Sequence, residues 1–174
     1  LKSLQSIDHL HFINKNHRIT SLESLSHVRT LTFKGHQRIK HFGNFPNLKE
    51  ISLYDVNIKN LESFKNAEIV RLCHCENLKS VKAITNAKNV KIDDCHGSRY
   101  GFPIDLSPLN RVQNLTLCNL PWLHDLTWLT DVVAVTISGC LNLSALGTLD
   151  NVQKLVIKDS RLSKLPADTK VNVP

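Results

Sequence analysis

The sequence contains no methionine, and only 6% of its 174 residues are aromatic. No apolar run approaches the roughly 20 residues that a membrane-spanning helix needs, which excludes such a helix. No run of lysine or arginine with interleaved aromatic residues occurs, so a stacking platform for single-stranded nucleic acid is disfavoured. Glycine-rich phosphate loops, nucleophiles beside a positioned base and convincing carboxylate pairs are also missing. The sequence therefore indicates a protein that is not an enzyme and carries no cofactor.

The dominant feature that is present is a pair of apolar residues separated by one residue, which recurs along the whole chain. Successive pairs begin 19 to 25 residues apart, and most begin 20 residues apart. Because a unit of this length cannot bury its apolar face alone, the copies are expected to stack around one shared core. The eight pairs are Leu10/Phe12, Leu31/Phe33, Ile51/Leu53, Val70/Leu72, Val90/Ile92, Leu115/Leu117, Val135/Ile137 and Leu155/Ile157.

Each pair lies within a longer frame that can be written LxxLxxLxxLxLxxC. This frame resembles the leucine-rich repeat and covers nearly the whole chain. Residues 105–109 (DLSPL) are similar to the opening of internalin-type repeats, whereas cysteine in the last place is more typical of repeats in ubiquitin-ligase adaptors and plant immune receptors. That last place, the ladder position, holds in order Lys15, His36, Val56, Cys75, Cys95, Leu120, Cys140 and Ser160.

The resemblance implies an α/β fold, a right-handed leucine-rich-repeat solenoid with a parallel β-sheet on its concave face. Side chains two apart in a strand point the same way, so each apolar pair should face the core. Apolar residues at every third position favour short 3₁₀ or extended segments on the convex face. We expect one domain of about eight coils over residues 1–174, with an inserted loop at 95–105. Because the chain lacks Met and opens on a repeat position, we also expect it to be a fragment of a longer protein.

The five cysteines are best explained by the repeat. Cys75, Cys95 and Cys140 occupy the ladder, where a buried, reduced thiol can satisfy the backbone of the adjoining turn. An odd count with repeat spacing disfavours a disulfide framework. A zinc site at residues 73–75 and 95–96 is disfavoured because neighbouring strand positions point to opposite faces, and no metal is expected. Free thiols favour an intracellular, cytoplasmic location, although sequons at 114–116 and 142–144 favour secretion.

The exposed face of the expected sheet supplies the candidate binding residues. Tyrosine and arginine are enriched at interface hot spots, which makes this face the candidate surface for a protein partner. The alternative is that these are solvated strand residues, and that the inserted loop is a neutral bulge with Phe102 tucked into the core. The candidate partner-binding residues are Tyr54, Ile69, Arg71 and Lys91 on the strands, with Arg99 and Tyr100 on the inserted loop.

Charge indicates an alternative function. The net charge is +7, and the first 60 residues hold nine Lys/Arg against four Asp/Glu, with six of the nine histidines. This basic third could bind a polyanion, either nucleic acid or an acidic lipid surface. His9 and His11 could share a metal or sense pH, but two ligands make a poor metal site. The leading hypothesis is a protein-recognition solenoid, a sensing or substrate-selecting module of an effector, receptor or adaptor, as the resemblance implies.

Overall fold

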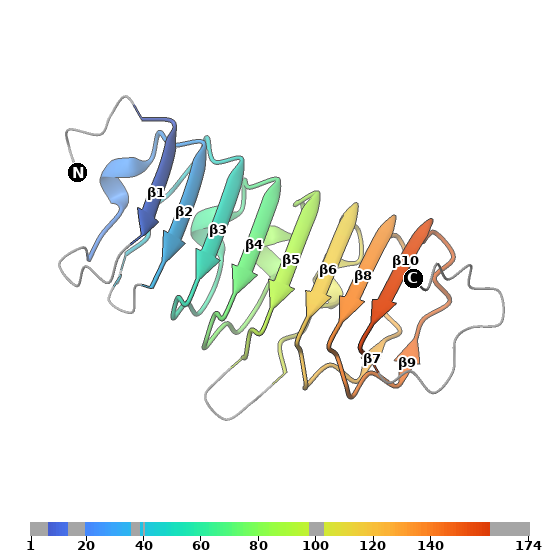
Figure 1. Cartoon of the computed structure of the whole chain (residues 1–174). Helices are drawn as coiled ribbons and strands as arrows, with labels where there is room; N and C mark the ends of the chain where they lie inside the picture. Colours follow the sequence, from blue (N-terminus) through green and yellow to red (C-terminus); the bar gives the residue numbers. More distant parts are fainter. Residues whose placement is uncertain (1–6, 14–19, 36–38, 40, 98–102, 161–174) are drawn as a thin grey trace.

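The computed structural model describes residues 7–13, 20–35, 39, 41–97 and 103–160 of the chain. Eight strands lie side by side in one parallel sheet, and their order in space follows their order in the sequence (Figure 1). The chain therefore makes about seven turns between the first strand and the last. The strands are β1 (His9–Ile13), β2 (Thr30–Lys34), β3 (Glu50–Tyr54), β4 (Ile69–Cys73), β5 (Asn89–Asp93), β6 (Asn114–Cys118), β8 (Ala134–Ser138) and β10 (Lys154–Lys158).

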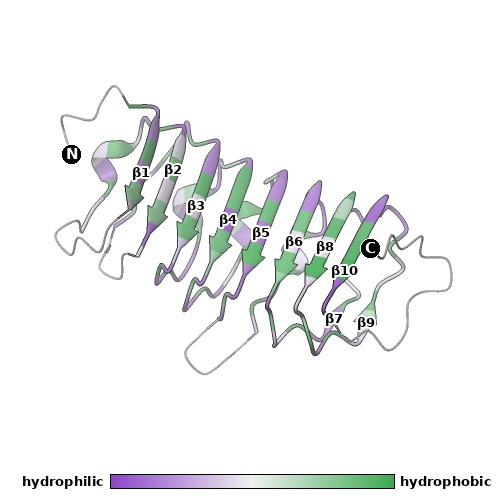
Figure 2. Ribbon diagram, viewed as in Figure 1, coloured by the Kyte–Doolittle hydropathy of each residue, from purple (hydrophilic) through white to green (hydrophobic). Residues whose placement is uncertain are grey.

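The recurring apolar pairs form the inward face of this sheet, as the spacing predicts. Neighbouring strands pair without any shift, so that Val70 lies beside Val90 and Leu72 beside Ile92. Val70 and Leu72 are fully buried, and bands of hydrophobic residues cross the sheet from strand to strand (Figure 2). The expected burial is incomplete in the two outermost strands: Leu10, Phe12 and Ile157 are partly buried, whereas Leu155 is buried.

Short 3₁₀ helices and extended segments lie opposite the sheet. They arise where apolar residues recur at every third position, which matches the three residues per turn of a 3₁₀ helix. The described residues contain no α-helix, so the helical part of the expected α/β class is limited to 3₁₀ turns. Nor does the described part contain a helix of the length and hydropathy needed to cross a bilayer. The elements are η2 (Glu23–Leu25), η3 (Glu62–Phe64), η4 (Lys82–Ile84), η5 (Ser107–Leu109) and the paired short strands β7 (Asp125–Leu126) and β9 (Ala145–Leu146).

A polar side chain opens most of these segments by accepting a hydrogen bond from the backbone N–H two residues later. In η3, for example, Asn60 Oδ1 accepts from the N–H of Glu62 at 3.2 Å. Asp105 and Asp125 make the same bond in later coils, which is the structural reason for the acidic residue in the DLSPL stretch. Ser21 and Ser80 complete the set.

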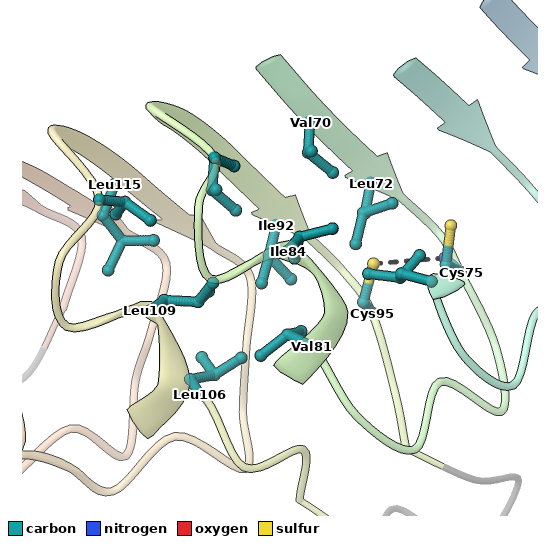
Figure 3. Packing of buried hydrophobic residues seen from close by; sticks show 14 of the residues in the cluster. Val70, Leu72, Cys75, Val81, Ile84, Ile92, Cys95, Leu106, Leu109 and Leu115 are labelled. Carbon is teal, nitrogen blue, oxygen red and sulfur yellow. Dashed lines mark hydrogen bonds between the residues drawn. The ribbon is translucent and has the colours of Figure 1, made fainter. Parts of the chain in front are cut away.

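The core changes in composition along the solenoid. Its N-terminal half contains a chain of phenylalanine rings: Phe12 to Phe33 (5.3 Å between centroids), Phe33 to Phe42 (6.5 Å), Phe42 to Phe64 (5.3 Å) and Phe64 to Phe45 (5.8 Å). From the fourth strand onward the core is built from smaller aliphatic side chains, seen around Val81, Ile84 and Leu109 in Figure 3.

The ladder position behaves as predicted wherever it is described. Cys75, Cys95 and Cys140 are fully buried, and all five thiols of the chain are free. The N–H of Cys75 donates to Cys95 Sγ of the next coil at 3.4 Å, the bond dashed in Figure 3. The N–H of Cys140 donates in the same way to Ser160 Oγ at 3.1 Å. Each small ladder side chain therefore satisfies the backbone of the preceding coil.

Every strand of the eight-stranded sheet from β2 onward is followed by one residue in the left-handed backbone region. These residues have φ between 47° and 76°, a range that glycine, asparagine and aspartate tolerate best. In the first six, the backbone N–H donates to the carbonyl of the last residue of the next strand, at 2.9–3.1 Å. The column comprises Gly35, Asp55, His74, Asp94, Asn119, Gly139 and Asp159.

Candidate partner-binding surface

The outward face of the eight-stranded sheet presents three side chains from each strand. The middle column of this face consists of the central residue of each strand. Strand pairing aligns these residues one beside the next, as the repeat spacing predicts. Seven of its members are at least partly exposed, and Ser52 is the exception with 4% exposure. The column runs His11, Thr32, Ser52, Arg71, Lys91, Thr116, Thr136 and Val156.

Four of the predicted binding residues lie on three neighbouring strands in the middle of this face. Arg71 and Lys91 are directly paired positions of β4 and β5, and Ile69 stands two residues before Arg71 on the same face. Tyr54 of β3 is paired with Cys73 at the far end of β4. All four side chains are partly exposed. The structure therefore brings these residues onto one patch.

The two loop residues predicted to assist this patch lie outside the described part of the chain. Arg99 and Tyr100 belong to residues 98–102, as does Phe102. The described flanks are continuous with the repeat on both sides, since Cys95 and Ile104 are both buried in the core. The contribution of Arg99 and Tyr100 therefore stays a prediction.

Each cation of the patch has a carboxylate partner on the same face. These carboxylates were not among the predicted binding residues. Arg71 of β4 forms an ion pair with Glu50 of the neighbouring strand β3, and their side chains are 40% and 32% exposed, respectively. Lys91 Nζ lies 3.0 Å from Asp93 Oδ2. Glu50 and Asp93 occupy outward positions of their strands, so the alternation of the sequence was sufficient to find them.

Hydrogen bonding keeps the Asp93 carboxylate charged. Burial raises its pKa, but hydrogen bonds from Lys91 and from Asn119 Nδ2, the latter at 2.9 Å, outweigh burial and hold the pKa below its ordinary value. The hydrogen bond to Asp93 correspondingly raises the pKa of Lys91. Both groups are thus ionised at neutral pH, and the patch has fixed, paired charges.

Two outward thiols flank Asp93, on β4 and β6. Cys73 is 7% exposed, and burial raises the pKa of its thiol to about 11. Burial also raises the pKa of Cys118, which is partly exposed. Because the thiolate is the nucleophile, neither side chain is activated for covalent catalysis at neutral pH.

The edge of the sheet at which the strands end (lower edge in Figure 1) contains a three-residue polar bridge. His74 Nδ1 lies 2.9 Å from Asp94 Oδ2, and His96 Nε2 lies 3.1 Å from Asp94 Oδ1. One carboxylate therefore ties two imidazoles of neighbouring coils together. Among the described residues, no group of three or more His, Cys, Asp or Glu side chains has a geometry that could hold a metal ion.

On the side opposite the strands, the described residues between β2 and β3 (35, 39 and 41–49) form no 3₁₀ helix, and a hollow of about 560 Å³ lies there. Gly43 draws the chain inward at φ 80°, where a Cβ would lie 2.9 Å from Glu23 Cα. Phe42, His41 and Lys59 line the hollow. Its mixed lining does not single out one ligand chemistry.

Comparison with known proteins supports the fold. Among solved structures, the chain is similar to an internalin (inlF) from Listeria monocytogenes str. 4b F2365, with a TM-score of 0.51 and 14% sequence identity. The match covers 82% of this chain and 51% of the internalin chain, so this chain spans about half the length of that protein. At this identity the likeness concerns the fold alone. No family model and no curated protein sequence matches the chain.

The internalin match agrees with the parallel solenoid fold that the frame of the sequence predicts.

Proposed function

We propose that this chain is a non-catalytic protein-recognition module whose partner binds the outward face of the eight-stranded sheet. The observation that carries the proposal is the patch of Tyr54, Ile69, Arg71 and Lys91 on three adjacent strands. The inward face repeats apolar side chains from coil to coil, whereas these outward side chains differ in size and chemistry. Residues that are not needed for stacking are free to serve recognition.

The ion pairs favour recognition rather than merely solvated charge. Arg71 and Lys91 are each held by a carboxylate of the same face, so a partner finds them already ordered. Ordering a long side chain on binding costs about 0.5–1.5 kcal/mol, and this cost is reduced for a side chain that is held beforehand. A partner with paired acceptors and donors, rather than a single sign of charge, fits this patch best.

An alanine scan of the patch against a matched set tests the proposal. With a partner obtained by affinity capture and then purified, we expect Tyr54→Ala or Arg71→Ala to weaken binding by about 2 kcal/mol without loss of fold. Lys59→Ala and Lys79→Ala, at exposed positions of the same coils away from the outward face, should leave affinity nearly unchanged. If the Lys59 and Lys79 variants weaken binding and the patch variants do not, the assignment is wrong.

The wider context is also part of the proposal. We take the coils to wind right-handed and the chain to be the sensing or substrate-selecting part of a longer effector, receptor or adaptor. An intracellular, cytoplasmic location agrees with five free thiols, three of them on the buried ladder. The alternative of polyanion binding through the basic N-terminal third gains no support from the fold or the comparison. A steep, log-linear loss of affinity with salt would favour that alternative over a hot-spot interface.

A further inference from the structure

The edge of the sheet at which the strands begin (upper edge in Figure 1) is basic over four coils. The residues that directly precede the strands form a hydrogen-bonded backbone column along this edge. The N–H groups of Lys49, Glu68 and Lys88 each donate to the carbonyl of the corresponding residue one coil earlier, at 2.7–2.9 Å. The column begins with Asp8, whose carbonyl accepts the N–H of Arg29 at 2.9 Å. Of the next four members, Arg29, Lys49 and Lys88 are cations and Glu68 is an acid.

This column already binds one carboxylate of the chain itself. Lys49 Nζ lies 2.8 Å from Glu68 Oε1, and Lys88 Nζ lies 2.6 Å from Glu68 Oε2. The hydrogen bonds from Lys49 and Lys88 lower the pKa of Glu68 to about 2. Lysines of neighbouring coils at this edge are thus spaced to hold a carboxylate between them.

A hollow beside this column contains two lysines that form no ion pair with any carboxylate of the described residues. It lies between η3 and η4 and is lined by Lys65, Asn66, Lys82, Asn86, Ala83 and Glu62. Lys65 and Lys82 are exposed, and within the described residues neither forms an ion pair, with Glu62 or with any other acid. Asn66 and Asn86 stand two residues before Glu68 and Lys88, so the hollow and the column adjoin. The column from Arg29 to Lys88 and the hollow, together with Arg111 at the repeat position of Asn86, carry six cations against Glu62 and Glu68.

We propose that this basic edge is a second interaction surface that binds an acidic segment of a protein, with a carboxylate of the segment received between Lys65 and Lys82. The chemistry of the edge favours this partner over other anions. No aromatic side chain lines the hollow, so bases would have no stacking partner. The large hydrophobic residues exposed in the described part are Val133 and Leu141. Val133 lies on the same edge but two column members beyond Lys88, so the basic coils themselves have no exposed apolar anchor for a membrane. The inference does not depend on the outward face of the sheet.

Fluorescence anisotropy with a dye-labelled peptide of ten glutamates tests this surface, with a ten-glutamine peptide as the uncharged control. At low salt we expect the glutamate peptide to bind and the glutamine peptide not to bind. The double variant Lys65→Gln/Lys82→Gln should weaken binding about tenfold, since each lost contact is a surface ion pair. Glu62→Gln should strengthen binding, because it removes the acid that competes within the hollow.

The matched control is Lys59→Gln/Lys79→Gln, which removes the same charge from the same two coils near the other edge. Lys59 and Lys79 are neighbours there, since the N–H of Lys79 donates to the carbonyl of Lys59 at 2.9 Å. If both double variants lose the same affinity for the glutamate peptide, the effect is due to net charge alone, and the proposal is overturned. Tighter binding of a ten-nucleotide oligothymidylate, or of phosphatidylserine vesicles, that is lost in Lys65→Gln/Lys82→Gln would also overturn it, by assigning the edge to nucleic acid or lipid.

Discussion

The indole N–H of Trp122 donates to the backbone carbonyl of Cys95 at 2.8 Å. One coil earlier the corresponding carbonyl, that of Cys75, accepts the backbone N–H of His96 at 3.2 Å. The residue that takes the place of His96 in the next coil is Pro121, which has no N–H to donate. Trp122 thus supplies with its side chain the bond that proline removes, at the one 25-residue step in the repeat.

Replacing Trp122 by Phe should therefore cost more than the loss of packing alone. Leaving the Cys95 carbonyl without a donor costs about 1–3 kcal/mol in the free energy of unfolding. Trp128→Phe is the matched control, because Trp128 is also partly buried against the core but makes no hydrogen bond within the described residues. Urea unfolding followed by circular dichroism measures both variants. Equal destabilisation would mean that the indole bond contributes nothing.

Phe64 should be a sensitive position of the phenylalanine chain, since its buried ring contacts both Phe42 and Phe45. Phe64→Ala is expected to lower the free energy of unfolding by about 3–5 kcal/mol, because it removes buried apolar area and leaves a cavity. The neighbouring Lys65→Ala, at an exposed position, should change it by less than about 0.5 kcal/mol. A small effect of Phe64→Ala in thermal or urea unfolding would show that the N-terminal core is loosely packed.

The five thiols should react with a disulfide reagent in a set order. Cys118 is the most exposed and should be labelled first at pH 8, followed by Cys73, whose pKa burial raises to about 11. The ladder thiols of Cys75, Cys95 and Cys140 should react only after denaturation, because they are fully buried. Mass spectrometry of time-quenched samples gives the order. Rapid labelling of all three ladder thiols in the native protein would contradict the buried ladder.

Glu68 should make stability depend on pH in the acid range. Its pKa falls from 4.5 to about 2 because Lys49 and Lys88 hydrogen-bond the carboxylate. A group whose pKa is lowered by folding stabilises the native state above its unfolded pKa, and this contribution is lost as pH falls. Wild type should thus exceed Glu68→Gln in melting temperature at pH 6, with the difference vanishing between about pH 4.5 and pH 2. Glu76→Gln, at an exposed position without an ion pair in the described part, is the control; the same pH dependence there would exclude the lysines as the cause.

The sheet could be predicted from the sequence because its side-chain period is two and its register follows the repeat. Arg71 and Lys91 occupy corresponding positions in two repeats, which is sufficient to place them side by side. The left-handed column was also visible in principle, as a run of Gly, Asp, Asn and His one residue after each strand. The opening caps were visible in the same way, as Ser, Asn or Asp two residues before each bonded N–H.

Other features depended on geometry that spacing does not contain. The pairing of Lys91 with Asp93, rather than with a neighbouring group, follows from rotamers and solvent exposure. The hydrogen bond from the Trp122 indole, which replaces a backbone donor, depends on the path of the chain through the 25-residue coil, and no periodic pattern specifies that path. The meeting of Lys65 and Lys82 at one hollow could not be predicted from the repeat, because the two lysines occupy different repeat positions and Lys82 corresponds to Glu62.

The left-handed column has a consequence for how such a protein changes over generations. Each coil makes the same backbone hydrogen bond to the next coil. Whole units of about 20 residues can therefore be gained or lost without leaving backbone groups unpaired at the junction. The proposed recognition surface would then lengthen or shorten by one strand at a time, in steps of about 4.8 Å. The number of repeats therefore sets the width of the sheet, and this width can change without any change in the outward-facing residues that are proposed to select the partner.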